Sequence, residues 1–321
     1  GHTVTSSSPV DCALRPNADG SATILLGDVE RVSRMRWRVE LTLRRGAALL
    51  EATMHLTNRT PFPGRFWFWA NSAAPLSKGM QYVSSATKVF TLKDVLDFPV
   101  HHGVDLSWDR NHSEPRDMFC LNPREDFVGW YNHDLKRGLV NVADRTEARG
   151  TKFYTWGSGD DGGIWEGLLT DEDGHYSEMQ IGRHVSQGVW EILGPHCEES
   201  WTECWYPIRR IGAPSYANRH VALAVQPEGA ALKVALQVTA PRKRARLCLQ
   251  VAGQASWEHP LDLDPGQPST VQIPFPSGGL AGSRADLILV DSAGEQLASY
   301  VCQGDNRPQP EFRGTMKIKA D

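Results

Sequence analysis

Helical periodicity is nearly absent from this chain of 321 residues, and that absence constrains the fold more than any other feature. Most apolar residues lie in short alternating runs separated by Gly, Pro, Asn or Asp, which is typical of β-strands joined by turns. Such runs are found at residues 21–30, 34–45, 48–58, 64–71, 152–157, 176–183, 200–208 and 220–226. Only Thr91–Phe98, which ends before Pro99, has helical spacing. The sequence therefore predicts an all-β protein with one short helix.

Tryptophan usage divides the chain. Of its eleven tryptophans only Trp257 lies beyond residue 220, and the later strand candidates are short and closely spaced. Short strands at that spacing favour a small immunoglobulin-like β-sandwich. We place the boundary near Val225–Gly229, which gives a large antiparallel domain at 1–225, the small sandwich at 226–305 and a polar tail at 306–321.

Charge and composition limit the classes of binding partner that the sequence gives reason to expect. Lys and Arg total 34 and Asp and Glu total 38, a net charge of −4 that gives no reason to expect nucleic acid or a membrane surface as partner. The first residues lack the features of a signal peptide, so we expect a cytoplasmic protein, while a leader removed earlier would leave export open. The basic run Arg242–Arg246 is interpreted as a solvated strand edge, with a docking site as the alternative.

Cysteine and acidic patterns do not indicate a metal. The six cysteines form no CxxC pair, which favours free thiols, with a Cys197–Cys204 bridge as the alternative. The Gly- and Asp-rich stretches 156–167 and 170–176 are expected to be turns, with calcium binding as the alternative. No HxH or HExxH spacing is present, so we expect neither a metal site nor another cofactor.

Strand alternation decides which side chains share a face. In residues 176–183, Tyr176, Glu178 and Gln180 lie on one face, opposite a core face that contains Met179 and Ile181. An aromatic ring, a carboxylate and an amide side by side are costly to bury without partners. We therefore expect this polar face to be presented to solvent.

Residues 200–208 divide in the same way. Trp201, Glu203 and Trp205 are expected on a presented face, and Cys204 and Tyr206 on a buried one. Two further runs place an aromatic beside a polar group on one face. These groups are Trp67, Trp69 and Asn71 in the first run, and Lys152, Tyr154 and Trp156 in the second.

If these strands share a sheet, their presented faces would form a groove lined with Trp, Tyr, Glu, Gln, Asn and Lys. Indole rings pack on the C–H faces of sugars, and carboxylates and amides bond the hydroxyls. Two carboxylates facing a glycosidic bond could also cleave it, and Glu178 and Glu203 are the leading pair, with Glu199 and Asp160 in reserve. The alternative is a second core layer in which each Glu pairs with an arginine such as Arg183 or Arg209.

As an ordered set, several motifs resemble a bacterial domain family of unknown function that is often found ahead of tetratricopeptide repeats. The family is similar to the galactose-mutarotase-like β-supersandwich superfamily. The motifs are residues 58–75, 100–108, 129–134, 142–145, 150–159, 173–187 and 199–218. The resemblance covers about residues 1–225 and implies a large supersandwich whose concave face holds a sugar.

The resemblance also implies a set of shared positions. They are His2, Asn71, His102, His133, Trp156, Glu178, Gln180, Gln187, Glu203 and Trp205. Taken with the alternation argument, this gives Glu178 and Glu203 as candidate catalysts. The candidate sugar ligands are His2, Asn71, His102, His133, Trp156, Gln180, Arg183 and Trp205. Because related domains begin with further strands, a missing N-terminal segment or a second chain is expected to complete the sandwich.

Four functions remain open at this stage. The first is a glycoside hydrolase that uses paired carboxylates, so an enzyme is favoured but not established. The second is a non-catalytic carbohydrate-binding or sensing module. The third is a mutarotase or epimerase with a Glu base and a His acid, for which His102 and His133 are the histidines to test, although a structural role is the alternative for each. The fourth is an assembly module whose aromatic face packs on another segment.

Overall fold

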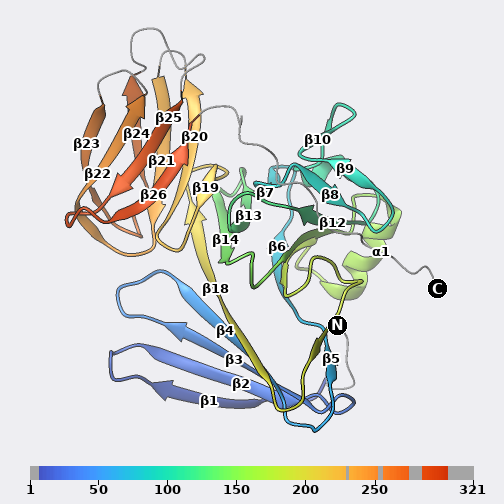
Figure 1. The fold of residues 1–321 in the computed structure, drawn as a ribbon. Helices are drawn as coiled ribbons and strands as arrows, with labels where there is room; N and C mark the ends of the chain where they lie inside the picture. Colours follow the sequence, from blue (N-terminus) through green and yellow to red (C-terminus); the bar gives the residue numbers. More distant parts are fainter. Residues whose placement is uncertain (1–6, 229–230, 252–255, 275–283, 303–321) are drawn as a thin grey trace.

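The computed structural model describes residues 7–228, 231–251, 256–274 and 284–302 (Figure 1). Two antiparallel sheets form the first domain, as the alternating runs predicted. The larger sheet contains, in order, β1 (Asp11–Pro16), β2 (Ala22–Val29), β3 (Met35–Leu43), β4 (Leu50–Asn58), β18 (Glu198–Arg209), β14 (Arg137–Ala143), β13 (Phe127–Asn132) and β7 (Met80–Ser84). The smaller contains β6 (Trp69–Pro75), β16 (Tyr176–Gly182), β15 (Gly150–Thr155), β12 (Arg116–Leu121), β8 (Lys88–Phe90) and β9 (Val95–Asp97).

The core of this large sandwich lies between its two sheets. Met54 and Trp201 of the eight-stranded sheet share one apolar cluster with Phe153 and Met179 of the six-stranded sheet. Two short hairpin sheets flank the sandwich: β10 (Val100–His101) with β11 (Val104–Asp105), and β5 (Gly64–Phe66) with β17 (Glu191–Leu193). The predicted all-β class is therefore confirmed.

A second sandwich follows, with one sheet of β19 (Tyr216–Ala217), β20 (Val221–Glu228), β21 (Ala231–Val238) and β24 (Ser269–Pro274). Its other sheet contains β23 (Trp257–Leu263), β22 (Arg242–Val251), β25 (Ala285–Val290) and β26 (Gln296–Val301). Because β19 pairs with β20 and β20 pairs with β21, the sandwich begins at Tyr216, and the expected boundary near Val225 falls within β20. The tail at 306–321 lies outside the described residues.

Two local predictions were wrong. Thr91–Phe98 is not a helix but the turn and second strand of the β8–β9 hairpin, because Leu92 has a φ of 69° and Thr91 bonds to Asp94 across the turn. The helices are instead α1 (Asp160–Leu169), in a stretch expected to be a turn, and the short 3₁₀ helix Asp109–Asn111. Arg242–Arg246 begins β22, and the pairing with β25 starts only at Arg246, so most of this basic run has a neighbouring strand on the β23 side alone and agrees with the expected solvated edge.

Three further sequence expectations can be compared with the structure. All six cysteines are free, including Cys197 and Cys204. Within the described residues, no group of three or more His, Cys, Asp or Glu side chains could hold a metal ion. No helix in that part of the chain is long and apolar enough to cross a membrane.

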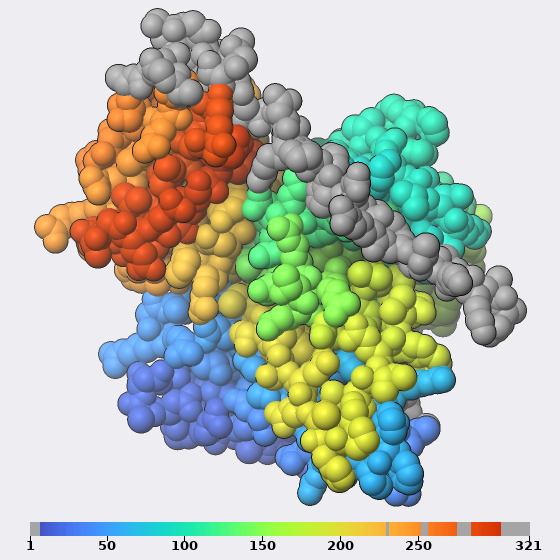
Figure 2. Space-filling view, viewed as in Figure 1, coloured from blue at the N-terminus to red at the C-terminus, as the bar shows by residue number. Residues whose placement is uncertain are grey.

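Apolar and charged contacts join the two sandwiches. Tyr206 and Ile208 on β18 pack with Ala222 and Ala224 of β20, all four being nearly fully buried. In the space-filling view the small sandwich, orange to red, lies against the green β13–β14 region and the blue N-terminal hairpins (Figure 2). The outer face of the eight-stranded sheet is therefore covered by protein along β18.

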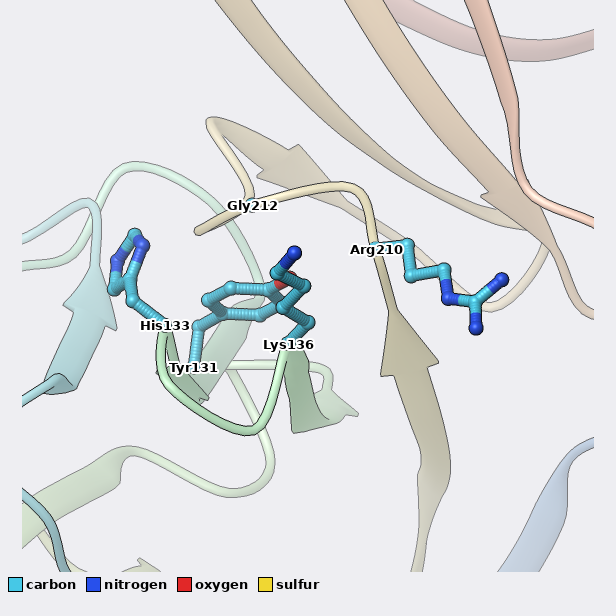
Figure 3. Close-up of a pocket in the computed structure, with 5 residues that line it drawn as sticks. All are labelled: Tyr131, His133, Lys136, Arg210 and Gly212. Carbon is cyan, nitrogen blue, oxygen red and sulfur yellow. The ribbon is translucent and has the colours of Figure 1, made fainter.

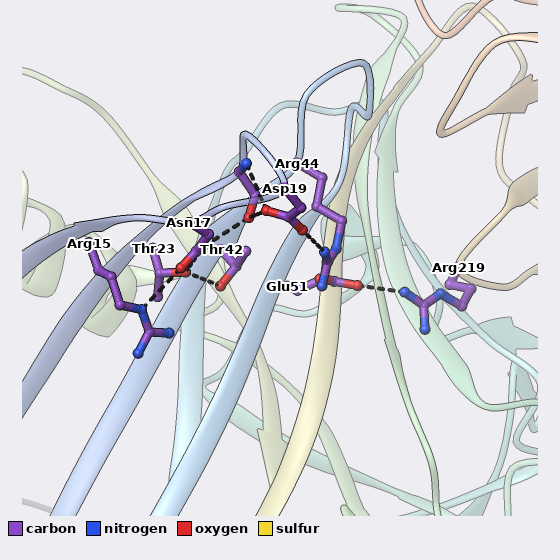
Figure 4. Close-up of polar contacts among 9 residues, drawn as sticks. Arg15, Asn17, Asp19, Thr23, Thr42, Arg44, Glu51 and Arg219 are labelled. Carbon is purple, nitrogen blue, oxygen red and sulfur yellow. Dashed lines mark hydrogen bonds and ion pairs between the residues drawn. The ribbon is translucent and has the colours of Figure 1, made fainter.

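Glu51 on β4 fastens the N-terminal hairpins to the second sandwich (Figure 4). Its Oε2 accepts from Arg44 Nε at 2.7 Å, and its Oε1 accepts from Arg219 at 2.5 Å. Arg44 also reaches Asp19 at 3.0 Å, while further along the same hairpins Asn17 donates to Thr23, which bonds to Thr42. The carboxylate thus pairs with one cation from each side of the junction.

We expect Glu51→Ala to lower the free energy of unfolding by about 1 kcal/mol, because both arginine partners are half-exposed and solvent screens the pairs. Urea unfolding at low and high salt measures the change, and the difference from wild type is expected to shrink with added salt. Asp19→Asn, which removes the charge that faces Arg44 and keeps an oxygen acceptor for the Ser21 N–H and hydroxyl, is the matched control and is expected to have the smaller effect. Equal effects of the two substitutions would show that Glu51 is not the fastening residue.

Candidate functional site

β16 carries the side chains around which the site is built. Its alternation was predicted correctly: Met179 and Ile181 are 1% exposed in the sandwich core, while Tyr176 and Glu178 on the opposite face are half-buried. One face of this strand therefore meets the core and the other faces away from it. The strands on either side of β16 decide what stands beside Glu178.

Cross-strand pairing brings polar residues from three neighbouring strands onto that outward face. Gln180 is paired with Asn71 on β6 and with Lys152 on β15. Glu178 is paired with Tyr154 on β15, which is paired in turn with Asp117 on β12. We call this surface the Glu178 face and define it by Asn71, Asp117, Lys152, Tyr154, Trp156, Tyr176, Glu178, Gln180 and Gln187. The condition that these strands share one sheet is met by β6, β15 and β16 but not by β18, which lies in the eight-stranded sheet.

A continuous hydrogen-bonded chain crosses the Glu178 face. Lys152 Nζ donates to Gln187 Oε1 at 2.8 Å, and Gln187 Nε2 donates to Gln180 Oε1 at 2.7 Å. Gln180 Nε2 then donates to Glu178 Oε2 at 2.6 Å, and Asn71 Nδ2 donates to the same oxygen at 2.7 Å. Two amide N–H groups therefore fix one carboxylate oxygen of Glu178.

Lys152 starts this chain from a buried position. The residue is 3% exposed, its ammonium lies 2.5 Å from Asp117 Oδ1, and it stands 5.0 Å from the Phe119 ring centre and 5.1 Å from that of Tyr154. A buried cation is costly unless it is paired and hydrogen-bonded. Here Asp117, Gln187 and the two rings supply those interactions.

Aromatic rings stand beside the polar chain. The Trp156 ring centre lies 4.8 Å from that of Tyr154, 6.1 Å from Tyr176 and 5.1 Å from Trp165 on α1. Burial, followed by the charges of Asp117 and Glu178, raises the pKa of Tyr154 to about 12. Burial and the charge of Glu178 also raise the pKa of Tyr176. Both phenols therefore remain protonated at neutral pH and can donate hydrogen bonds.

Glu203 does not lie on the Glu178 face, and the expectation that its side of β18 is presented was wrong. Glu203 is 1% exposed and Trp201 4%, and Trp201 and Trp205 pack in the core of the large sandwich. The Glu203 carboxylate accepts from Trp201 Nε1 and Asn141 Nδ2, each at 3.3 Å. Burial raises its pKa to about 7, against the opposing effect of these donors. The structure thus separates Glu178 and Glu203 into different sheets.

His133 marks a separate pocket (Figure 3). It lies at the end of β13, where it bonds to Gln81 at 2.9 Å and stacks on Trp108 with ring centres 5.1 Å apart. Tyr131, Lys136, Arg210 and Gly212 line the pocket with it. In the close-up, Lys136 extends beside Tyr131, whereas the Arg210 guanidinium points away (Figure 3). Burial lowers the pKa of His133, so this imidazole is neutral at pH 7.

The other predicted ligands are not on the Glu178 face. His102 is exposed in the β10–β11 hairpin beside His101, with a φ of 48°. Arg183 pairs with Glu199 at 3.0 Å and donates to the carbonyl of Glu147, so both it and the reserve carboxylate Glu199 have structural partners. Asp160 lies in the first turn of α1. His2 lies outside the described residues.

The prediction missed two members of the site. Asp117 stands in the run 116–121, where it alternates with Met118 and Cys120, so the same period-two argument that found Glu178 would have found it. Trp165 lies on α1, in a stretch rich in Gly and Asp that gave no helical signal. Gln187 was expected only from the family resemblance, since it lies between strands where alternation has no meaning.

Comparison with known proteins agrees with this architecture. The profile of a family described as a domain of unknown function, DUF5107, matches residues 1–208, and that of a "YphG-like protein, second domain" matches residues 216–300. A TPR-domain containing protein from Parabacteroides distasonis is 23% identical with a TM-score of 0.60, over 68% of this chain and 38% of its own. A galactose mutarotase-like protein from Clostridium acetobutylicum is 9% identical with a TM-score of 0.45, over 63% of this chain and 67% of its own. The chain thus spans well under half of the Parabacteroides protein, and at 23% identity that likeness shows the fold alone.

Proposed function

The chain belongs to the DUF5107 family, which is described as a domain of unknown function, and we propose from its own residues that it binds a carbohydrate on the Glu178 face. The observation that carries the proposal is a carboxylate oxygen fixed by two amide donors beside three aromatic rings. Sugar rings present apolar C–H faces to aromatic side chains and hydroxyl donors to carboxylates. The exposed amide of Asn71 and the phenols of Tyr154 and Tyr176 add further hydrogen-bonding groups at the edge of the rings.

Binding without catalysis is favoured over the two enzymatic functions. Hydrolysis by paired carboxylates needs a protonated carboxyl as general acid. Glu178 Oε2 accepts two N–H bonds and Asp117 pairs with an ammonium, so both carboxyl groups are held as acceptors. An epimerase with a His acid needs a histidine beside Glu178, and no described histidine contacts it.

A glycoside hydrolase remains the second candidate because of one observation. Asp117, Tyr154 and Glu178 form a row across three adjacent strands. Strands in a sheet lie about 4.8 Å apart, so the backbones of Asp117 and Glu178 are roughly 10 Å apart, which leaves room for a sugar between two carboxyl groups. In this candidate the carboxyl pair is Asp117 and Glu178, in place of the pair Glu178 and Glu203 that the sequence suggested.

Binding is tested by calorimetric titration of cello-, malto- and galacto-oligosaccharides with product detection on the same samples. We expect Trp156→Ala to weaken binding of the recognised sugar at least tenfold, because it removes the central ring of the aromatic group. Trp190→Ala, which removes an exposed tryptophan stacked on Arg65 outside the Glu178 face, is the matched control and should bind as wild type does.

Substitutions of the carboxyl groups distinguish carbohydrate binding without catalysis from glycoside hydrolysis. Glu178→Gln is expected to weaken binding, with Glu198→Gln, an exposed change on β18, as its control. If products form and both Asp117→Asn and Glu178→Gln abolish turnover, the hydrolase is correct. If no sugar binds the wild type, or Trp156→Ala binds like Trp190→Ala, the proposal of a carbohydrate site fails.

A further inference from the structure

The hydrogen-bonded chain on the Glu178 face has a direction, and a single residue sets it. An ammonium carries three donors and no acceptor, so the atom of Gln187 that faces Lys152 must be the carbonyl oxygen. The Gln187 amide nitrogen then faces Gln180, whose oxygen accepts and whose nitrogen in turn faces Glu178. The orientation of a side-chain amide is otherwise ambiguous, but here the charge at one end determines both amides.

We infer that Lys152 is a positioning residue that holds Glu178 as a hydrogen-bond acceptor, so that the group which contacts Glu178 in the ligand is a donor, the hydroxyl of a neutral sugar and not the carboxylate of a uronic acid. The inference rests on the proposed function and names its ligand class. Lys152 acts through Gln187 and Gln180 and does not itself reach the ligand. The chain uses Oε2 of Glu178, so Oε1 is not engaged by it.

Burial holds the hydrogen-bonded chain from Lys152 to Glu178 in one arrangement. Gln180 is 5% exposed and Lys152 3%, so water does not readily replace either partner. Asp117 balances the charge of Lys152 and the Phe119 and Tyr154 rings cover it, which keeps the ammonium in place. Hydrogen bonds in such a setting support one another, and reversing one amide would set oxygen against oxygen at one of its ends and donor against donor at the other. The arrangement of lowest free energy is therefore the one in which every donor of the chain points from Lys152 toward Glu178.

Gln187→Glu is the sharpest test, because it reverses the chain while changing little in volume. The new carboxylate accepts from Lys152 but cannot donate to Gln180, so the Gln180 amide turns to donate to it and presents its oxygen to Glu178. We expect binding of neutral oligosaccharides to fall at least tenfold at pH 7.5, because the Gln180 oxygen then faces the Glu178 carboxylate. The charged and titratable groups that face Glu178 directly or through the chain are Tyr154, Tyr176, Asp117 and Lys152.

Gln187→Leu breaks the chain without reversing it and is the matched control. It should weaken binding less than Gln187→Glu, whereas a purely structural role of Gln187 predicts the same loss for both. Uronate-containing counterparts of the same oligosaccharides should bind the wild type more weakly than the neutral ones. If Gln187→Glu binds as wild type does, or if the uronates bind better, the inference is overturned.

A readout that needs no sugar keeps this inference separate from the proposed function. We expect the side-chain NH₂ protons of Gln180 and Gln187 to exchange slowly in wild type and at least tenfold faster in Lys152→Met, measured by NMR. Unchanged exchange in Lys152→Met would overturn the role of Lys152 even if sugars bind. If this buried substitution prevents folding, Gln187→Leu provides the same comparison at Gln180. If exchange behaves as expected but no sugar binds the wild type, the carbohydrate proposal fails and the amide chain stands.

Discussion

Glu203→Gln is expected to make the protein more stable at pH 8 by about 3 kcal/mol, with almost no effect near pH 4.5. The pKa of Glu203 is raised from about 4.5 in the unfolded chain to about 7 in the folded protein, because burial in the core disfavours the charged carboxylate. Between these two values the folded protein binds a proton that the unfolded chain has released. The free energy of unfolding of the wild type therefore falls as pH rises through this window, and an uncharged amide removes that dependence.

The neighbourhood of Glu203 can accept an amide. Trp201 Nε1 and Asn141 Nδ2 donate to the present carboxylate, and Asn141 Oδ1 is buried without a partner. If the Asn141 side chain turns over, its oxygen accepts from the amide nitrogen that Glu203→Gln introduces, and the amide oxygen still accepts from Trp201. Asn141 Nδ2 then stands where Oδ1 now lies without a partner, so the substitution exchanges one unpartnered buried atom for another.

Urea unfolding of wild type and Glu203→Gln at pH 5 and pH 8 measures the difference. Glu203→Ala is the comparison, since it also removes the charge but leaves a cavity and two unpaired donors, and we expect it to lose stability at pH 5. Sugar binding by Glu203→Gln should equal that of wild type, because Glu203 lies in the core. A variant that is less stable than wild type at pH 8 would mean that the core favours the charged carboxylate, contrary to the raised pKa.

The two strands at the centre of the sequence argument show where alternation works and where it fails. On β16 one face meets the core and the other carries the half-buried Tyr176 and Glu178, so alternation placed Glu178 correctly, although Gln180 on the same face is buried beside Gln187 and not presented to solvent. On β18 both faces are covered: Trp201 and Glu203 face the six-stranded sheet, and Tyr206 and Ile208 face the second sandwich. Alternation separates two faces of a strand but does not say which of them is covered.

Tertiary context also explains the misplaced helix. α1 contains three glycines, at positions 162, 163 and 167, and leaves Ile164 and Leu168 more than half exposed, so neither helix propensity nor an amphipathic pattern indicates it. Thr91–Phe98 has the spacing of a helix but is held as a hairpin by the turn at Thr91–Asp94 and by pairing of Val95 with Phe90. The amide chain could not be foreseen either, since Gln187 reaches it from outside any strand.

The junction between the two sandwiches depends on Tyr206, and Tyr206→Ala is expected to lower the free energy of unfolding by about 3–5 kcal/mol. The side chain is 1% exposed, and its hydroxyl donates to the carbonyl of Asn218 at 2.8 Å and to that of Val221 at 3.2 Å. Burial raises the pKa of this phenol far above its usual value, so the hydroxyl remains a donor at every pH at which the protein is folded. One side chain on β18 thus ties the first sandwich to the start of the second.

Calorimetry separates the two contributions of Tyr206. Tyr206→Phe keeps the ring in the junction and removes only the hydroxyl, so it should lose about 1–2 kcal/mol and still unfold with the cooperativity of wild type. Tyr206→Ala also removes the ring that packs against Ala222 and Ala224, and the two sandwiches are then expected to unfold in separate transitions, because each retains its own core. If Tyr206→Ala instead unfolds in one transition at the wild-type temperature, the sandwiches are coupled by other contacts, of which the Glu51 pairs are the first to examine.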